Sequence, residues 1–259
     1  MSVQSVDMRT HAFLGASLAL LFGSLQAGDG KSESARASAP VVLPDPLYEQ
    51  RAEHDPNGIG VFYFGREIAH VMGHQAAGWL ERPDREQEER TDLLVEALGL
   101  KEGEHVADIG AGSGYFCWRM AGRVGASGRV YGVDIQPEML EILARNMAKR
   151  GVSNVETVLG LEADPKLPEG KVDTMLMVDV YHEFGKPYEM MGKMVAALKR
   201  GGRIVFVEYR AEDPKVPIKR VHKMSEAQVR KEMSAFPQMR WEKTETVLPQ
   251  QHIIIFRKD

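Results

Sequence analysis

The amino-acid sequence predicts an α/β fold with a doubly wound, mostly parallel sheet. Strand-like apolar runs alternate with helix-compatible segments from residue 104 onward. One apolar strand, Val106–Ile109, runs into a turn with three glycines at alternate positions. Two further strands close the chain around a tight connection at 248–250. Such alternation is typical of a parallel sheet that carries helices on both faces.

The expected elements follow from this alternation in chain order. The first strand ends at the glycine turn, and the last two strands form a hairpin. The expected strands are 104–109, 128–133, 154–159, 172–179, 202–209, about 240–247 and 251–257, and the expected helices are 114–124, 137–149, 187–199 and 225–235.

The segment that precedes this alternation, 48–100, is expected to form a helical cap. Its 59–79 part has helical apolar spacing after Gly65. Residues 82–98 are expected to form a second helix, which is charged first and apolar later.

The composition limits the classes of function. The 259 residues are 43% hydrophobic, enough for one α/β domain with extensions. The net charge is −4 and no long basic run occurs, so no nucleic-acid partner is expected. Cys117 is the single cysteine, which rules out an intramolecular disulfide. No Cys/His cluster has zinc-site spacing, and His70 and His74 lack an evident third ligand, so no metal site is expected.

The N-terminus resembles an export signal. Residues 1–27 combine a basic start, an apolar run of about 14 residues and a small-residue end, and Met8 gives a cleaner start than Met1. Residues 28–47 are expected to form a flexible linker. We therefore expect a periplasmic or secreted protein with no stable membrane insertion after cleavage. An uncleaved membrane anchor and a buried apolar helix are the alternatives.

The glycine spacing distinguishes between two kinds of cofactor. A dinucleotide turn, G-x-G-x-x-G counted from Gly110, requires a glycine at position 115, which is Tyr115. A nicotinamide dehydrogenase is therefore disfavoured. The next strand, Arg129–Val133, delivers Asp134, whose carboxylate can accept hydrogen bonds from two ribose hydroxyls.

The pattern Asp108-x-Gly110-x-Gly112-x-Gly114 resembles motif I of the class I S-adenosylmethionine (SAM) methyltransferases, and Asp134 resembles their ribose-binding acid. The resemblance implies a Rossmann-like seven-stranded sheet with an antiparallel C-terminal hairpin strand, and a SAM-binding domain over 101–259. It implies that SAM is held by residues of this turn and of the next strand's end: Asp108, Gly110, Ala111, Gly112, Gly114, Asp134 and Ile135.

An acid after the third strand is also implied. The family often places a carboxylate there beside the adenine amino group. The Gly-Asp pair of that motif is replaced here by Gly160-Leu161, and the nearby acids are Glu162 and Asp164. We expect Asp164 to take this role, with Glu162 as the alternative.

The segment after the fourth strand is where acceptor and donor are expected to meet. It lies at the carboxyl end of a parallel strand, outside which ligands bind in such sheets. His182-Glu183-Phe184 resembles the His-Asp-Trp segment of small-molecule O-methyltransferases, in which the histidine is the general base. The expected catalytic residues are His182, Glu183 and Tyr181, and Asp179 is expected near the amino-acid part of the cofactor. Packing of His182 at the strand end is the alternative.

The function that these features predict is methyl transfer from SAM to a small-molecule acceptor through oxygen, nitrogen or sulfur. His222, Gln251 and His252 are further candidates for the acceptor side, and Glu208-Tyr209-Arg210, which follows the fifth strand, is a further candidate for substrate contact. One alternative is a non-catalytic SAM-fold binding protein of the cell envelope. A second is a polyamine-synthase-like transferase, for which residues 181–183 offer no pair of acids. The expected export conflicts with this function, because it would separate the protein from the cytoplasm, where SAM is made.

Overall fold

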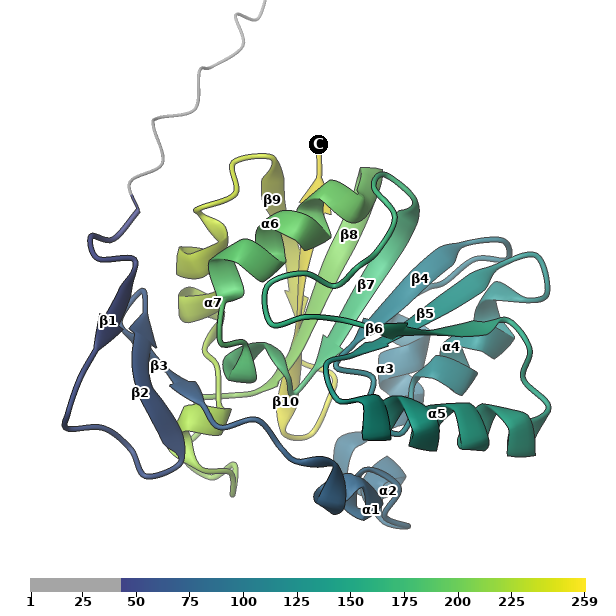
Figure 1. Ribbon diagram of the computed structural model, residues 1–259, viewed down its shortest axis with the longest axis horizontal. Helices are drawn as coiled ribbons and strands as arrows, with labels where there is room; N and C mark the ends of the chain where they lie inside the picture. The colour runs from purple at the N-terminus through teal and green to yellow at the C-terminus, as the bar shows by residue number, and fades with distance from the viewer. Residues whose placement is uncertain (1–42) are drawn as a thin grey trace, which may run out of the picture. The chain divides into compact units, whose positions relative to one another are not determined.

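The structure is a computed structural model that describes residues 43–259 (Figure 1). The expected signal segment, 1–27, and most of the expected linker, 28–47, lie outside the described residues. Within 43–259, no helix combines the length and the apolar character that a membrane span requires.

A seven-stranded sheet forms the centre of the fold, with the order β6-β5-β4-β7-β8-β10-β9. Its first five strands in this order are parallel, and β10 is antiparallel to both β8 and β9. The strands are β4 (His105–Ile109), β5 (Arg129–Asp134), β6 (Val155–Leu159), β7 (Val172–Val178), β8 (Leu198–Tyr209), β9 (Met239–Glu245) and β10 (Gln251–Lys258). The predicted doubly wound sheet and its closing antiparallel hairpin are confirmed.

Helices cover both faces of this sheet, and each face has its own hydrophobic core. Along β7, Met175 and Met177 lie in one core and Leu176 lies in the other, because successive side chains of a strand point to opposite faces. The helices are α3 (Thr91–Ala97), α4 (Cys117–Val124) and α5 (Pro137–Arg150) on one face, and α6 (Pro187–Ala197) and α7 (Glu226–Met233) on the other.

The N-terminal part of the described chain is a small antiparallel sheet. It consists of β1 (Tyr48–Gln50), β2 (Gly58–Tyr63) and β3 (Arg66–Ala69). The predicted helix after Gly65 is therefore wrong. Phe64 and Gly65 both have positive φ angles, 50° and 86°, which form the tight turn that favours a β-hairpin over a helix.

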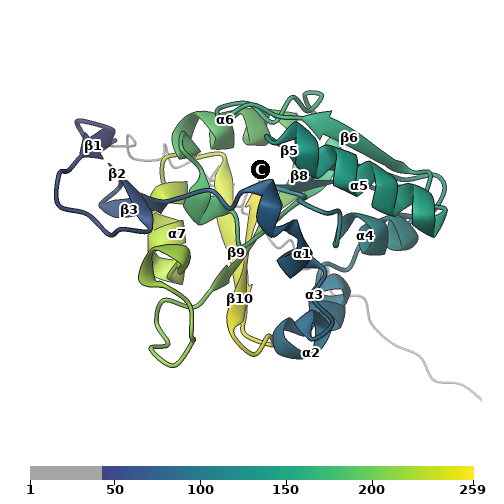
Figure 2. The same cartoon turned by 60° about the horizontal axis from the view of Figure 1, so that its bottom comes forward.

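The expected cap is helical only in its second half. It contains the 3-10 helix η1 (His74–Ala76) and the short helices α1 (Ala77–Leu80) and α2 (Arg85–Glu89), followed by α3. The single helix expected over 82–98 breaks at Arg90, whose φ of 53° is left-handed and incompatible with a continuous α-helix. Figure 2 shows the segment between β3 and α1 passing across one end of the large sheet.

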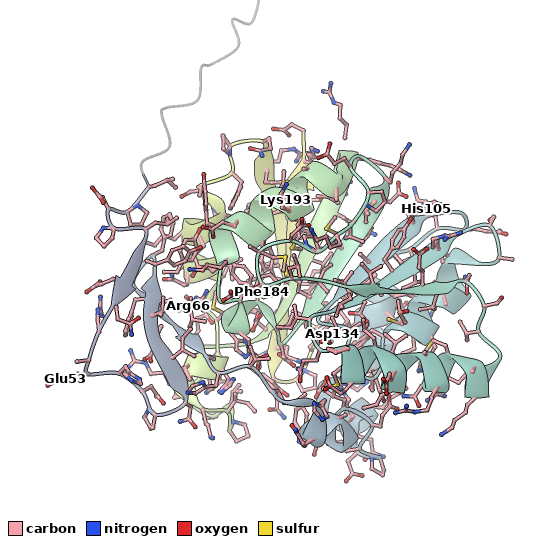
Figure 3. All side chains as sticks on the ribbon, in the orientation of Figure 1. Glu53, Arg66, His105, Asp134, Phe184 and Lys193 are labelled. Carbon is pink, nitrogen blue, oxygen red and sulfur yellow. The ribbon has the colours of Figure 1, made fainter. Side chains whose placement is uncertain are left out.

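The arrangement of β4 and β7 positions the candidate site. These strands are neighbours, and Ile109 pairs with Met177, but the chain leaves β4 towards β5 on one side and reaches β7 on the other. Such a reversal of strand order opens a crevice at the carboxyl ends of the strands. Asp134 lies at this end of the sheet, opposite to the end that carries His105 (Figure 3).

Candidate active site

The glycine turn after β4 forms one wall of the site. Its three glycines, Gly110, Gly112 and Gly114, all have positive φ angles. A Cβ atom on Gly110 would lie 2.4 Å from Val180 Cγ2, and one on Gly112 would lie 2.5 Å from Leu80 Cδ1. The turn therefore needs bare backbone both for its conformation and for its close contacts.

Asp134 at the end of β5 is held by backbone groups of two neighbouring segments. Its Oδ2 accepts a hydrogen bond from Gly112 N at 2.9 Å, and its Oδ1 accepts one from Gln136 N at 2.9 Å. Burial raises the pKa of this carboxyl group, and these N–H groups oppose the rise. Each carboxylate oxygen has a second lone pair, so Asp134 can accept hydroxyl donors from a ligand as well.

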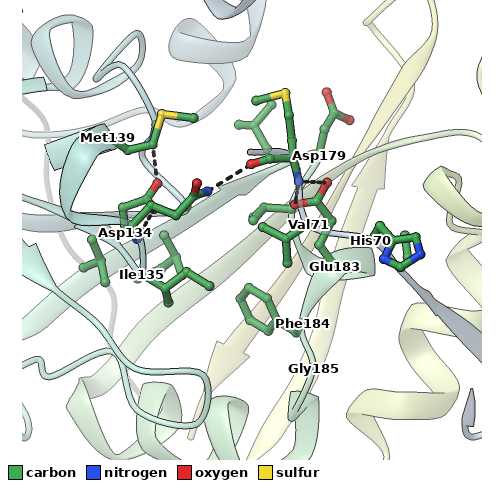
Figure 4. Close-up of a pocket in the computed structure, with 18 of the residues that line it drawn as sticks. His70, Val71, Asp134, Ile135, Met139, Asp179, Glu183, Phe184 and Gly185 are labelled. Atoms are coloured by element: carbon green, nitrogen blue, oxygen red, sulfur yellow. Dashed lines mark hydrogen bonds between the residues drawn. The ribbon is translucent and has the colours of Figure 1, made fainter. Parts of the chain in front are cut away.

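A cavity of about 590 Å³ lies at the carboxyl ends of β4, β5 and β7 (Figure 4). This volume falls within the range of roughly 300–1,000 Å³ that is usual for small-molecule sites. Its wall combines the glycine turn, the strand ends, the segment after β3 and the end of the 3-10 helix η2 (Tyr181–Glu183). The lining residues include Gly110, Gly112, Asp134, Ile135, Gln136, Met139, Glu162, Asp179, Val180, Glu183, His70, Val71, Met72, Trp79, Leu80 and Arg85.

Asp179, the residue after β7, carries an unpaired acceptor into this wall. Its Oδ2 accepts a hydrogen bond from Gln251 Nε2 at 2.6 Å, whereas its buried Oδ1 has no partner among the described residues. Burial and the nearby carboxylates of Glu208 and Glu89 raise the pKa of Asp179 well above its usual value. A buried acceptor without a partner costs free energy, which a ligand donor would recover.

Arg85 provides a cationic group on the same wall. Its guanidinium donates to Glu89 Oε2 at 3.0 Å and to the carbonyl of Leu80 at 2.9 Å, and it lies over the ring of Tyr115 at 4.3 Å. These contacts fix a buried positive charge next to the cavity and leave other N–H groups of its fork for a ligand.

A buried cluster of acids and imidazoles lies behind the pocket at η2 (Tyr181–Glu183). His182 Nδ1 is 2.7 Å from Glu208 Oε2, and His182 Nε2 is 3.1 Å from His222 Nδ1. Burial lowers the pKa of His182 to about 4, although the charge of Glu183 opposes this shift. The imidazole is therefore neutral near pH 7.

Glu183 is the member of this cluster that lines the pocket. Its two oxygens each lie 3.3 Å from Met72 N, which donates to them. Burial raises its pKa to about 7, while the His182 charge and the Met72 N–H oppose the rise. Glu208, at the end of β8, is fully buried, and burial raises its pKa to about 8 against the opposing charge of Arg66.

The structure brings together most, but not all, of the residues expected from the sequence. Pocket-lining positions are taken by Gly110, Gly112, Asp134, Ile135, Asp179 and Glu183. Ala111 and Gly114 belong to the same turn but are not lining residues, and His182 lies behind Glu183.

Three expected residues have other surroundings. Asp108 is buried, and its Oδ2 accepts a hydrogen bond from Cys117 Sγ at 3.2 Å. Asp164 accepts from Lys166 N and pairs with the Lys166 ammonium group, while Glu162, the alternative acid, lines the pocket. Tyr181 is fully buried in the core between Phe184 and Phe206.

Sequence reasoning missed Gln136, which follows β5, and several lining residues of the 70–80 segment, including Met72 and Leu80. Gln136 Nε2 donates to the carbonyl of Met72, and its Oε1 accepts from His74 N, both at 2.9 Å. These contacts depend on the path of the 70–80 segment across the end of the sheet, and no local sequence pattern predicts that path. One feature of the sequence pointed to Glu208: it is an acid that directly follows the apolar run 204–207 at the end of a strand.

Residues 100–251 match a family described as a methyltransferase domain, and the chain belongs to this family. Among solved structures, a SAM-dependent methyltransferase from Aquifex aeolicus matches with a TM-score of 0.68 and 23% identity over 73% of this chain and 100% of that one. A SAM-dependent O-methyltransferase from Thermotoga maritima matches with a TM-score of 0.50 and 19% identity, covering 74% of this chain and 73% of that chain. These identities establish the fold alone.

Curated relatives match somewhat less than half of the chain. Protein-L-isoaspartate O-methyltransferase 1 of Archaeoglobus fulgidus is 33% identical over 119 residues, which are 44% of this chain and 55% of that protein. Demethylmenaquinone methyltransferase of Tropheryma whipplei is 38% identical over 112 residues, 43% of this chain and 44% of that protein. The chain thus spans about half the length of these relatives. Together, the family and these SAM-dependent neighbours imply SAM as the cofactor.

Proposed function

We propose that the protein transfers the methyl group of SAM to a small-molecule acceptor with an oxygen, nitrogen or sulfur nucleophile. The observation that carries this proposal is one cavity lined by the glycine turn, by Asp134 and by the acid Glu183, with His182 directly behind Glu183. The proposed donor site and a group able to accept a proton thus line the same cavity. The names of the relatives give different acceptors, namely protein L-isoaspartate, arsenite and demethylmenaquinone, so the relatives do not identify the acceptor of this protein.

The residues of the pocket fit SAM in charge and shape. Asp134 is proposed to accept the ribose hydroxyls, and the glycine turn to lie against the nucleoside without a Cβ in the way. The unpaired Oδ1 of Asp179 suits the ammonium of the amino-acid part, and Arg85 suits its carboxylate. Asp108, Ala111 and Gly114 support the turn from beneath, and Glu162 is better placed than Asp164 for the adenine side. SAM supplies an electrophilic methyl group on a sulfonium centre.

The proton of the acceptor is proposed to leave through the His182–Glu183 pair. Glu183 touches the pocket and is held by Met72 N–H, so it is the member that contacts the acceptor. His182 lies behind it, with Nε2 4.0 Å from Glu183 Oε1, and Glu208 fixes the ring through Nδ1. A positioned proton acceptor contributes typically 10²–10⁴-fold to such a reaction.

An apolar rim favours an acceptor with an apolar body. Val71 and Trp79 line the pocket, yet 47% and 44% of their surfaces remain exposed. Both lie on the segment that crosses the sheet end, so they face whatever enters beside the donor. Exposed apolar side chains around a cavity are typical of a ligand-binding rim.

Turnover with SAM labelled in its methyl group, measured over a panel of apolar phenols, amines and thiols, tests this proposal. The Glu183→Gln variant is expected to lose at least about 100-fold in kcat on a hydroxyl acceptor, because it removes the proton acceptor. His105→Gln, at the opposite end of the sheet, serves as the matched control. Full activity of both Glu183→Gln and His182→Gln would contradict the assigned roles.

We also propose that the N-terminal residues 1–27 direct export. Their basic start, short apolar run and small-residue end support this assignment. Cell fractionation of the full chain, with a variant whose apolar run is broken by Leu18→Arg, tests it. We expect a shortened, extracytoplasmic form for the wild type and a cytoplasmic form for the variant, whereas cytoplasmic wild-type protein would contradict export.

A further inference from the structure

We infer that His182, Glu183 and His222 form a binding site for one divalent transition-metal ion of the zinc type, placed beside the donor pocket. Two imidazole nitrogens and a carboxylate oxygen are the donor set that zinc and its neighbours prefer in open sites. The inference rests on the proposed function only for what the ion would do, not for its binding.

The spacing of the donor atoms suits a shared ion. His182 Nε2 and His222 Nδ1 are 3.1 Å apart, and one ion at the usual zinc–nitrogen distance of about 2.0–2.1 Å can contact both. Glu183 Oε1 lies 4.0 Å from each nitrogen, so a side-chain shift of less than about 1 Å brings it into a tetrahedral arrangement. Among the described residues, these three form a group whose donor atoms lie within 4.8 Å of one another.

The surroundings of His182 resemble the support that metal-bound histidines have. Glu208 is fully buried, and its Oε2 lies 2.7 Å from His182 Nδ1. In the tautomer that donates from Nδ1 to Glu208, Nε2 keeps its lone pair towards His222 and Glu183. Tyr181 N donates to the other Glu208 oxygen at 3.0 Å and fixes that carboxylate. A carboxylate behind a histidine orients the ring and raises its basicity as a ligand.

The local charge also favours a dication. Arg66 donates to the His182 carbonyl but is already paired with Glu232 at 2.8 Å. Within the described residues, no Lys or Arg side chain forms an ion pair with Glu183 or Glu208, whose side-chain contacts are to the histidines of the cluster. A bound divalent ion would balance these two buried carboxylates, whose isolated burial is costly.

The site joins segments that are distant in the sequence. His182 and Glu183 belong to η2, while His222 ends the 3-10 helix η3 (Arg220–His222), and β3 packs against both. This separation explains why no ligand spacing was visible in the sequence. An ion here would link η2 to η3 and stabilise the folded chain by mass action.

The ion would change how an acceptor is activated. With the ion bound, His182 and Glu183 act as ligands instead of proton acceptors. A hydroxyl or thiol that occupies a free coordination position has a lower pKa and becomes the nucleophile without a separate base. Because Glu183 lines the pocket, that position would face the donor side.

Equilibrium dialysis of the tag-free full chain against Zn²⁺, after treatment with a chelator, tests the inference, with Co²⁺ absorption as a second readout of coordination. We expect one ion per wild-type chain, a tetrahedral Co²⁺ spectrum and a rise in Tm on Zn²⁺ addition. Affinity is expected to fall by at least 100-fold in His222→Ala and by about 10–100-fold in Glu208→Gln. The control His105→Gln is expected to retain it, and His222→Gln serves if His222→Ala does not fold.

Wild-type protein that takes up no stoichiometric ion, or variants that bind like the His105→Gln control, would overturn the inference. S-adenosylhomocysteine binding to the wild-type chain, measured with and without Zn²⁺, separates this result from the proposed function. Loss of metal binding with cofactor binding intact refutes only the metal site, whereas loss of cofactor binding refutes the methyltransferase.

Discussion

Gly110 is required both by its backbone conformation and by the side chain of Val180, which packs against it beside the pocket. Its φ of 71° is unfavourable for other residues, and the space where its Cβ would be is filled by the side chain of Val180, which lines the cavity. Gly151 after α5 shares the left-handed conformation, with a φ of 66°, but has nothing within 4 Å of its Cβ position. A comparison of substitutions at Gly110 and Gly151 therefore distinguishes the cost of left-handed backbone strain from the cost of steric contact.

We predict that Gly110→Ala destabilises the protein more than Gly151→Ala and weakens S-adenosylhomocysteine binding at least 10-fold. Both variants carry the left-handed strain of about 1–2 kcal/mol, but only the first must displace Val180. Thermal unfolding and calorimetric titration measure the two effects. Equal losses of stability and affinity in both variants would contradict the assigned contact.

Asp108 is a buried carboxyl group that contacts Cys117 and does not line the pocket. Burial raises its pKa to about 7, and the hydrogen bond from Cys117 opposes the rise. An unfolded chain has a pKa of about 3.9 for this group. Because the folded pKa is the higher one, the folded state holds the proton more tightly, and its stability falls as pH rises from about 4 to 7.

Asp108→Asn is predicted to remove this pH dependence. Relative to the variant, the wild type should lose about 2 kcal/mol between pH 5 and pH 8, because only the wild type must carry a buried negative charge. Urea unfolding of both proteins at the two pH values measures the difference. A wild-type-to-variant difference that stays constant with pH would show that Asp108 is already ionised at pH 5.

Among the secondary-structure elements, the strands and helices after residue 104 were predictable and the N-terminal segment was not. Short apolar runs fix the strands of a buried parallel sheet, so β4 to β10 lie within a few residues of their expected positions. The spacing at 59–79 fits a helix equally well, but the left-handed turn at Phe64 and Gly65 imposes a hairpin. Such turns depend on backbone angles that composition does not reveal.

The segment between β3 and α1 lines the pocket and is hydrogen-bonded to the Gln136 side chain. We predict that Gln136→Ala accelerates amide hydrogen exchange over residues 70–80 and weakens S-adenosylhomocysteine binding about 3–10-fold, because two hydrogen bonds of roughly 1 kcal/mol each are lost. Gln87→Ala, on the exposed face of α2, is the control. Unchanged exchange in 70–80 would mean that other contacts hold the segment.

For the whole described molecule, the proposed donor and acceptor sides share one pocket because strand order reverses between β4 and β7. The glycine turn follows β4, Asp134 ends β5, and the cluster around His182 follows β7 and ends β8. The pocket-lining positions of Gly110, Gly112 and Asp134 follow from one glycine motif and the end of the next strand, so they could be predicted from the sequence. The Glu208 and His222 partners of His182 could not be, because packing of distant segments brings them together.

Calorimetric titration of the full chain with S-adenosylhomocysteine tests the central claim most directly. The account predicts one binding site per chain, with an affinity that falls at least 10-fold in Asp134→Ala, since this change removes the carboxylate proposed to hold the ribose. Asp173→Ala, at the opposite end of the sheet, should bind like the wild type. Absence of binding to the wild-type chain, or wild-type affinity in Asp134→Ala, would contradict the account.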